Sequence, residues 1–248
     1  MSNRIAPKLL AEFIGTFALI FIGAGAAAVV GGGAGLPGVA AVAFAHGLTV
    51  MAFAFAYGTV SGGHFNPSVT IAVLAAGAMR VGEAAGYVVS QFAGGILGAL
   101  LLRAVLGGTG TSLGTPDLAH NLGLGATTLT VTPWAGYVIE AVLGFFLSTV
   151  VLSTAVAGRA GNLAPLAIGV TLIFNIIMGG PLTGAAFNPA RAFGPMVATG
   201  NFSDAWLYLT APIAGAIVAA ILHAGLARIS QERTTASERD SVARTAAE

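Results

Sequence analysis

Two short stretches decide the fold, His64-Phe-Asn-Pro-Ser-Val-Thr70 and Phe187-Asn-Pro-Ala-Arg-Ala-Phe-Gly-Pro195. Each places an Asn-Pro pair after small residues, within an apolar segment too short to cross a membrane. Proline suits the first position of a helix, because its missing N–H needs no partner there, and asparagine suits the cap before it. We therefore predict that Ser61–Ala76 and Thr183–Val197 are re-entrant loops followed by half-helices with asparagine caps.

The two stretches belong to an internal repeat. Ser61–Ser68 aligns with Thr183–Ala190 at an offset of 122 residues, and Tyr87 aligns with Tyr208 at an offset of 121. Each half contains three predicted spans, an odd number, so the halves must be inverted relative to each other in the membrane. Inverted repeats whose broken helices meet near the midplane are an architecture for moving solutes.

The composition supports a membrane protein and excludes several other classes. Of the 248 residues, 56% are hydrophobic and 8% are charged, against roughly a quarter charged in soluble domains. The formal net charge of +1 without a basic run excludes a nucleic-acid partner. Because cysteine is absent, disulfides and thiolate metal sites are excluded as well. No cluster of nucleophile and base is apparent, so we expect neither an enzyme nor a cofactor or metal.

Six apolar segments are long enough to span a bilayer. They lie near Leu9–Val30, Gly38–Val60, Glu83–Leu106, Pro133–Ala157, Asn162–Pro181 and Asp204–Ile229. The predicted fold class is therefore an all-α membrane protein, with six transmembrane helices plus two re-entrant half-helices in an inverted three-plus-three repeat. One channel domain covers residues 1–229, with halves at about 8–106 and 133–229 joined by the loop 107–132, and a C-terminal tail follows at 230–248.

The distribution of basic residues predicts the orientation, because Lys and Arg are enriched in short cytoplasmic loops. With the N-terminus inside, Arg103 alone lies toward the outside, and the inner side holds Arg4, Lys8, Arg80, Arg159 and Arg228. We therefore expect both termini in the cytoplasm and the protein in the lipid bilayer of a cell membrane, inner or plasma.

These motifs and their spacing resemble the aquaporin and glycerol-facilitator family, the major intrinsic proteins, over Lys8–Ile229. The resemblance implies a passive channel for water and small neutral solutes, assembled as a homotetramer with one pore per subunit. It also implies that the pore centre is formed by Asn66, Pro67, Ser68, Asn188, Pro189 and Ala190. Ser68 stands where the family usually has alanine, and we expect little functional change from this small hydroxyl.

The pore centre can exclude ions if the two half-helices enter from opposite faces. Their N-termini then meet, and each brings the positive end of a helix dipole, equivalent to about half an elementary charge. The amide groups of Asn66 and Asn188 can donate hydrogen bonds to a passing oxygen. A water held by two donors points its own hydrogens away and does not relay a proton through that point.

The family resemblance also implies an outer selectivity filter at four positions counted from the two asparagines. In this sequence they are His46, Ile176, Ala185 and Arg191. An arginine at membrane depth is costly unless it faces water or a partner. This filter pattern resembles the plant tonoplast intrinsic branch, which implies ammonia, urea and peroxide as solutes besides water. The neighbouring Asn175 is interpreted as a hydrogen-bonding group between helices.

Other polar residues leave alternatives open. The resemblance implies that Glu12 and Glu140 anchor the re-entrant loops, whereas lone carboxylates in spans would also suit a proton-coupled secondary transporter. His120 is a candidate fifth filter residue or a solvated loop residue, and His64 is a candidate for the cytoplasmic mouth. A glycerol or urea facilitator is the nearest rival, but Ala192 stands where glycerol facilitators usually have an aspartate.

Overall fold

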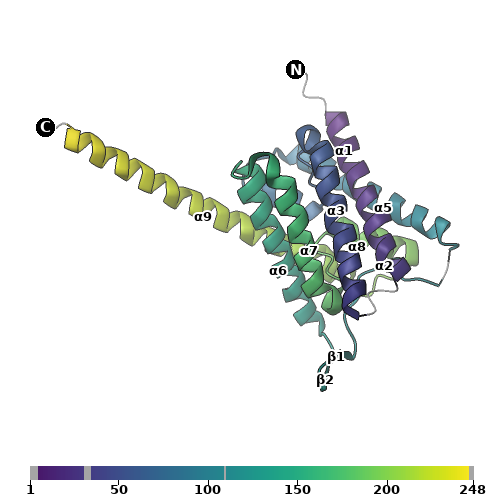
Figure 1. Ribbon diagram of the computed structural model, residues 1–248. Helices are drawn as coiled ribbons and strands as arrows, with labels where there is room; N and C mark the ends of the chain where they lie inside the picture. Colours follow the sequence, from purple (N-terminus) through teal and green to yellow (C-terminus); the bar gives the residue numbers. More distant parts are fainter. Residues whose placement is uncertain (1–4, 31–34, 109, 246–248) are drawn as a thin grey trace.

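Figure 1 shows the computed structural model, which describes residues 5–30, 35–108 and 110–245, with the backbone alone for residues 35, 36, 124 and 230–245. Six helical segments of this part are long and apolar enough to cross a membrane. They are Ile5–Val30, Pro37–Ser61, Val81–Val105, Pro133–Val156, Gly161–Thr183 and Ala205–Ile229. Their bounds lie close to those expected from the sequence, and the predicted fold class is confirmed.

Several spans are composed of more than one element. The first runs through α1 (Ile5–Ala18), the π-helix η1 (Leu19–Ala24) and α2 (Gly25–Val30), and the fourth joins α6 (Pro133–Val151) to the π-helix η2 (Leu152–Val156). The remaining helices are α3 (Gly35–Ser61), α4 (Pro67–Ala75), α5 (Val81–Val105), the short 3₁₀ turn η3 (Gly161–Leu163), α7 (Ala164–Thr183), α8 (Pro189–Thr199) and α9 (Ala205–Thr245).

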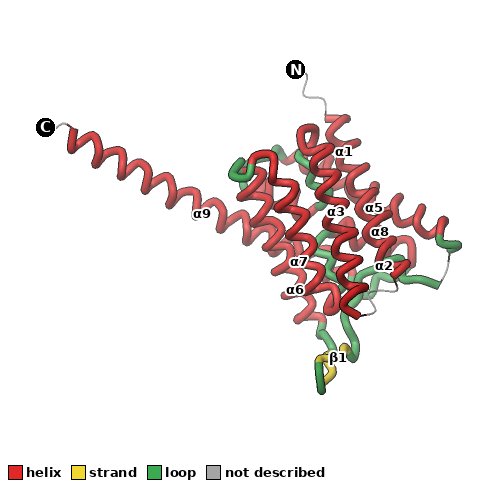
Figure 2. Tube along the Cα trace, viewed as in Figure 1, coloured by secondary structure: helices red, strands yellow, loops and turns green. Residues whose placement is uncertain are grey.

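The long connection between α5 and α6 carries a small hairpin, which Figure 2 shows at one end of the bundle. Strand β1 (Leu122–Leu124) pairs antiparallel with β2 (Thr127–Leu129), and Leu122 lies opposite Leu129. We call this end the hairpin side. The opposite end, where α1 begins and α9 leaves the bundle, is called the terminal side (Figure 1).

The half-helices join the two halves of the repeat. Helix α4 of the first half packs against α9 of the second, and α8 of the second half packs against α5 of the first. The approach of α8 to α5 requires glycine, because a Cβ atom added to Gly194 would lie 2.4 Å from the carbonyl oxygen of Gly95. Backbones can approach closely in membrane helix pairs only where such small residues line the contact.

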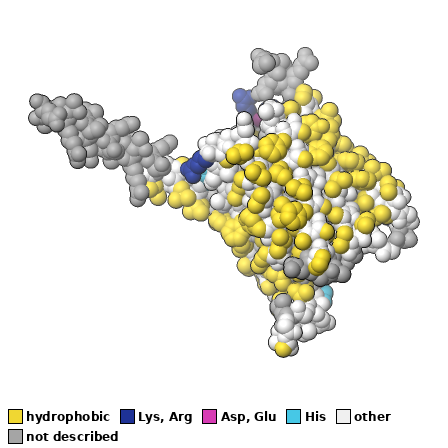
Figure 3. Space-filling view, viewed as in Figure 1, with side chains coloured by type: hydrophobic (Ala, Val, Ile, Leu, Met, Phe, Trp, Pro, Cys, Tyr) yellow, Lys and Arg dark blue, Asp and Glu magenta, His cyan; other side chains and the backbone are white. Residues whose placement is uncertain are grey.

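The flank of the bundle is apolar, as expected for a surface that faces lipid or another subunit. Figure 3 shows hydrophobic side chains over most of the face in view, and the exposed ones on α3 and α7 include Phe44, Phe55, Phe174 and Met178. Near the hairpin side the exposed rings of Trp134 and Trp206 lie edge to face, with centroids 6.0 Å apart. Paired tryptophans of this kind are typical of a membrane–water interface.

The C-terminal segment differs from a simple tail. The tail predicted from residue 230 begins as a continuation of α9, which stays helical to Thr245 and projects away from the bundle (Figure 1). The sequence after Ile229 is rich in charged and hydroxyl residues. A helix without an apolar stripe has no face to bury, which explains why it leaves the bundle.

Candidate functional site

The two asparagines cap the half-helices, as predicted. Asn66 has an extended backbone (φ −157°), and its side-chain oxygen accepts a hydrogen bond from the Ser68 N–H at 2.8 Å. The side-chain oxygen of Asn188 (φ −153°) accepts from the N–H groups of Ala190 at 3.0 Å and Arg191 at 3.2 Å. Pro67 and Pro189 follow as the first helical residues.

The amide groups of the asparagines tie each half-helix to the opposite loop. Asn66 donates to the carbonyl of Phe187 at 3.0 Å, and Asn188 donates to the carbonyl of Phe65 at 2.9 Å. Phe65 and Phe187 have φ values of 48° and 31°, a strained conformation for residues other than glycine. Since an amide group carries two N–H donors, one on each asparagine is left for a solute.

Ser68 adds a contact that the usual alanine lacks. Its hydroxyl donates to the side-chain oxygen of Asn66 at 2.7 Å and also lies 3.2 Å from the carbonyl oxygen of Phe187. The hydroxyl therefore links the two half-helix entrances from a completely buried position.

Replacing Ser68 with alanine is expected to lower the free energy of unfolding by about 1 kcal/mol, the usual net value of one hydrogen bond. Water permeability should change little, because the Asn66 amide keeps its bond to Phe187. Thermal unfolding in detergent and light scattering of reconstituted vesicles measure the two quantities. The exposed Thr210, whose hydroxyl donates to the Trp206 carbonyl, offers Thr210→Val as a control. A large loss of permeability in Ser68→Ala would assign the hydroxyl to conduction.

Glu12 holds the first re-entrant loop from a completely buried position. One carboxylate oxygen accepts from the Ser61 hydroxyl at 2.7 Å and the His64 N–H at 3.0 Å. The other accepts from the Phe65 N–H and the Gln91 amide, both at 2.7 Å. Both oxygens are thus occupied by donors, as a loop anchor requires.

Glu140 occupies the equivalent place in the second half and is also completely buried. One oxygen accepts from the Thr183 hydroxyl at 2.6 Å and the Ala186 N–H at 3.0 Å, and the other accepts from the Phe187 N–H at 2.6 Å. The arrangement matches that of Glu12 with one difference. The residue aligned with Gln91 in the second half is Pro212, which has no side-chain amide to donate.

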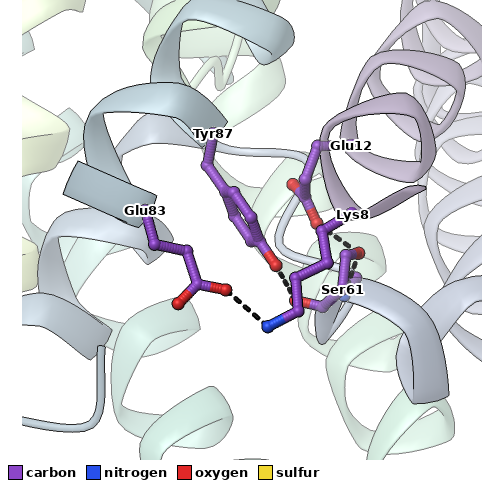
Figure 4. A network of polar contacts seen from close by, with 6 residues as sticks. Lys8, Glu12, Ser61, Glu83 and Tyr87 are labelled. Carbon is purple, nitrogen blue, oxygen red and sulfur yellow. Dashed lines mark hydrogen bonds and ion pairs between the residues drawn. The ribbon is translucent and has the colours of Figure 1, made fainter. Parts of the chain in front are cut away.

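Two tyrosines support the same loops, although the sequence repeat gave no role to them. The hydroxyl of Tyr87 donates to the carbonyl of Ser61 at 2.7 Å, and that of Tyr208 donates to the carbonyl of Thr183 at 2.7 Å. Figure 4 shows Tyr87 reaching Ser61 beside Glu12, with the ion pair between Lys8 and Glu83 (2.6 Å) nearby. Their alignment in the repeat was the signal that would have identified them.

Three cavities lie in series through the bundle. The middle one, about 30 Å³, is lined by both asparagines and by His46, His64 and Arg191. It shares Arg191 with a cavity of about 310 Å³ on the hairpin side. It shares Gly62 and Ile168 with a cavity of about 530 Å³ on the terminal side. The shared residues show that the three cavities are neighbours and follow one another from the hairpin side to the terminal side.

The four candidate filter residues gather at the junction on the hairpin side. His46, Ala185 and Arg191 line the middle cavity, and Ile176 and Arg191 line the cavity on the hairpin side. Ala185 has a φ of 42° and, like the other three residues, is buried.

Two polar atoms of this junction have no protein partner within the described residues. His46 Nδ1 lies 2.9 Å from the Val42 carbonyl, which only accepts, so Nδ1 carries the proton and Nε2 presents a lone pair. That Nε2 atom is buried and unpaired. Arg191 donates from Nη1 to the Gly114 carbonyl at 2.8 Å, while its Nε is buried and unpaired. The junction therefore offers one free acceptor and one free donor.

The remaining predicted polar residues separate into different places. His64 lines the middle cavity, with Nδ1 3.1 Å from the Thr70 hydroxyl. His120 is exposed and lines none of the three cavities, so this structure does not bring it to the filter. Instead it lies near Asp204. The pKa of Asp204 is raised above its usual value, mainly by burial and also by Asp117, and His120 offsets part of this shift. Asn175 donates to the Leu143 carbonyl at 3.0 Å, a contact between α7 and α6, as predicted.

The described residues contain no group of three or more His, Asp or Glu side chains placed to hold a metal ion.

Comparison with known proteins adds independent findings. The model of the "Major intrinsic protein" family matches residues 2–223. Aquaporin NIP1-2 of Oryza sativa subsp. japonica is 39% identical over 86% of this chain and 69% of its own length. Aquaporin TIP4-4 of Zea mays is 39% identical over 88% and 85%, and Nodulin-26 of Glycine max is 37% identical over 89% and 78%.

A solved structure supports the fold. The X-ray structure of the aquaglyceroporin from Plasmodium falciparum superposes with a TM-score of 0.73 at 21% identity and covers 89% of this chain and 96% of that one. Since the NIP1-2 and TIP4-4 relatives are equally identical to this chain, overall similarity does not place it in the tonoplast intrinsic branch that the filter pattern resembles. With the six spans and paired half-helices, the family match shows that the chain belongs to the major intrinsic protein family.

Proposed function

We propose that this protein is a passive transmembrane channel for water and small neutral solutes, including ammonia, that excludes protons and ions. The observation that carries the proposal is the series of three cavities, of which the smallest is lined by both asparagines and by His46 and Arg191. A volume of about 30 Å³ holds about two water molecules. Solutes would therefore pass this segment in single file.

Ion exclusion is proposed to have two sources. The N-termini of α4 and α8 meet at the centre. There the positive ends of the helix dipoles repel cations, and the asparagine amides donate hydrogen bonds to the oxygen of a passing solute. Arg191 adds a positive charge at the junction with the hairpin side. Channel selectivity of this kind combines pore width, lining donors and electrostatic barriers.

Ammonia is proposed as a solute because of the chemistry of the filter. None of the four filter positions holds Phe, Tyr or Trp, so the imidazole of His46 is the one ring among these four side chains that can limit the width of the filter. The free lone pair of His46 Nε2 accepts, and Arg191 Nε donates. Water and ammonia each carry both a donor and a lone pair and fit such a pair of groups. We therefore include in this proposal the likeness of the filter to that of the plant tonoplast intrinsic branch.

The experiment measures osmotic water permeability and ammonia permeability in one preparation of reconstituted vesicles. Both should exceed the values of empty vesicles. If water passes while ammonia matches the empty vesicles, ammonia is removed from the proposal. If glycerol or urea passes faster than either, the rival facilitator of the same family is the better description.

Replacing His46 with phenylalanine should narrow the filter and remove its acceptor. We expect ammonia permeability to fall more than water permeability, because the lost acceptor and the added ring act on the same junction. Stopped-flow measurements with a pH dye for ammonia and light scattering for water give the two rates. Unchanged selectivity in a folded variant would remove His46 from the filter.

The proposal also includes the assembly and the orientation. We propose a single channel domain over residues 1–229, a homotetramer in the lipid bilayer of a cell membrane, and cytoplasmic termini. The apolar flank of α3 and α7 and the positions of the basic residues support these assignments. No cofactor and no enzymatic step are part of the proposed transport.

A further inference from the structure

The π-helix η1 interrupts the first span directly beside the filter. π-Helical turns are rare and occur frequently at functional sites. Gly23, near the end of η1, is buried against the ring of His46. A Cβ atom added to Gly23 would lie 2.6 Å from His46 Cδ2 and 2.8 Å from its Nε2. Ordinary contacts between carbon atoms are about 3.5–4.0 Å, so any side chain at this position must displace the ring.

The next residue of η1 contacts the other side of the filter. Gly114 supplies the carbonyl that accepts from Arg191, and it packs against Ala24. A Cβ atom on Gly114, which has a φ of +67°, would lie 2.7 Å from the Ala24 carbonyl oxygen. One segment therefore backs both the imidazole and the loop that holds the guanidinium.

The imidazole has little freedom to move elsewhere. Its Nδ1 is held by the Val42 carbonyl one helical turn earlier, at 2.9 Å. The ring lies between η1 and the middle cavity, since it contacts Gly23 and lines that cavity. A displacement of about 1 Å away from a new methyl group would therefore carry the ring into a space of about 30 Å³.

We infer that Gly23 is a specificity-determining positioning residue, which sets the aperture of the filter by giving the His46 ring room to withdraw from the path. The inference rests on the proposed function and deepens it. The smallest residue on η1 keeps the Nε2 lone pair available and the junction open. A larger residue would narrow the path without changing any group that touches the solute.

The test compares Gly23→Ala, His46→Ala and the double variant in reconstituted vesicles. Gly23→Ala should lower water permeability by about tenfold and urea permeability by more, because the larger solute needs the wider aperture. The double variant should match His46→Ala, since removing the ring makes room for the methyl group. Gly225→Ala is the matched control, because a Cβ on this helical glycine meets no atom within 4 Å, and it should behave as wild type.

The outcomes separate this inference from the proposed function. If wild type does not conduct, the proposed function fails. If wild type conducts and folded Gly23→Ala conducts equally, with the same ratio of urea to water, the inference about Gly23 is wrong. Should Gly23→Ala fail to fold, the double variant decides the matter. Permeability equal to that of His46→Ala supports the steric pairing, and a further loss contradicts it.

Discussion

Replacing Arg191 with valine is expected to make the channel leak monovalent cations while it continues to pass water. The guanidinium lies at the junction of two cavities and is held by the Gly114 carbonyl. Two like charges about 5 Å apart repel by about 3 kcal/mol at an effective dielectric constant of about 20, which corresponds to roughly a hundredfold in rate. Removing this charge and its bulk should therefore raise both cation leak and urea permeability.

Current recordings in planar bilayers and urea flux in vesicles measure these effects. Arg103→Val is the matched control, because Arg103 also donates to a backbone carbonyl, that of Ala198, but lines none of the three cavities. It should leave selectivity unchanged. An Arg191→Val channel that stays tight to cations would mean that the half-helix dipoles and asparagines exclude ions without the arginine.

Replacing Glu140 with alanine is expected to prevent stable folding. The change leaves the N–H groups of Ala186 and Phe187 buried without an acceptor, and it leaves the Thr183 hydroxyl with only a long contact, 3.4 Å, to the Gly179 carbonyl. Each unpaired buried group costs about 1–3 kcal/mol, and the sum is a large part of a typical total stability of about 5–15 kcal/mol. Yield and thermal unfolding of the purified protein measure the loss.

Glu83→Ala provides the contrast, because Glu83 is partly exposed and forms an ion pair with Lys8. Such a pair contributes about 0–1 kcal/mol, so this variant should fold normally. If Glu140→Ala folds as stably as wild type and loses only transport, the carboxylate acts on the solute or on protons rather than on the loop. That result would favour the proton-coupled alternative.

Local signals in the sequence were enough to predict the six spans, the two half-helices and the repeat that relates them. Proline after asparagine specified the half-helix starts at Pro67 and Pro189, and the repeat specified that the halves are inverted. The candidate filter positions came from the family resemblance, as fixed spacings to the asparagines. The structure places His46 and Arg191 on the middle cavity and Ile176 and Arg191 on the adjoining one.

Other features depend on contacts that no local pattern reports. The acceptor of Arg191 is a backbone carbonyl, that of Gly114, in a loop 77 residues away. Backbone carbonyls are present at every residue, so the sequence carries no sign of which one is used. The π-helix η1 packs against α3 and α5, with Gly23 against His46, and the position of His120 away from the filter depends on the path of the loop.

The sequence identified only some of the side chains that hold the re-entrant loops in place. Tyr87 and Tyr208 align in the repeat, yet the repeat alone does not show that their hydroxyls donate to the carbonyls of Ser61 and Thr183. Gln91 had no signal at all, because its counterpart in the other half is proline and the repeat does not mark it.

The most direct test of the account is water flux across reconstituted vesicles that contain a pH-sensitive dye, measured at several temperatures and in both directions. A passive channel predicts a non-saturating flux that is equal in both directions, depends weakly on temperature and leaves the internal pH unchanged. Solute accumulation driven by an imposed pH gradient, or a proton current that accompanies water, would contradict it.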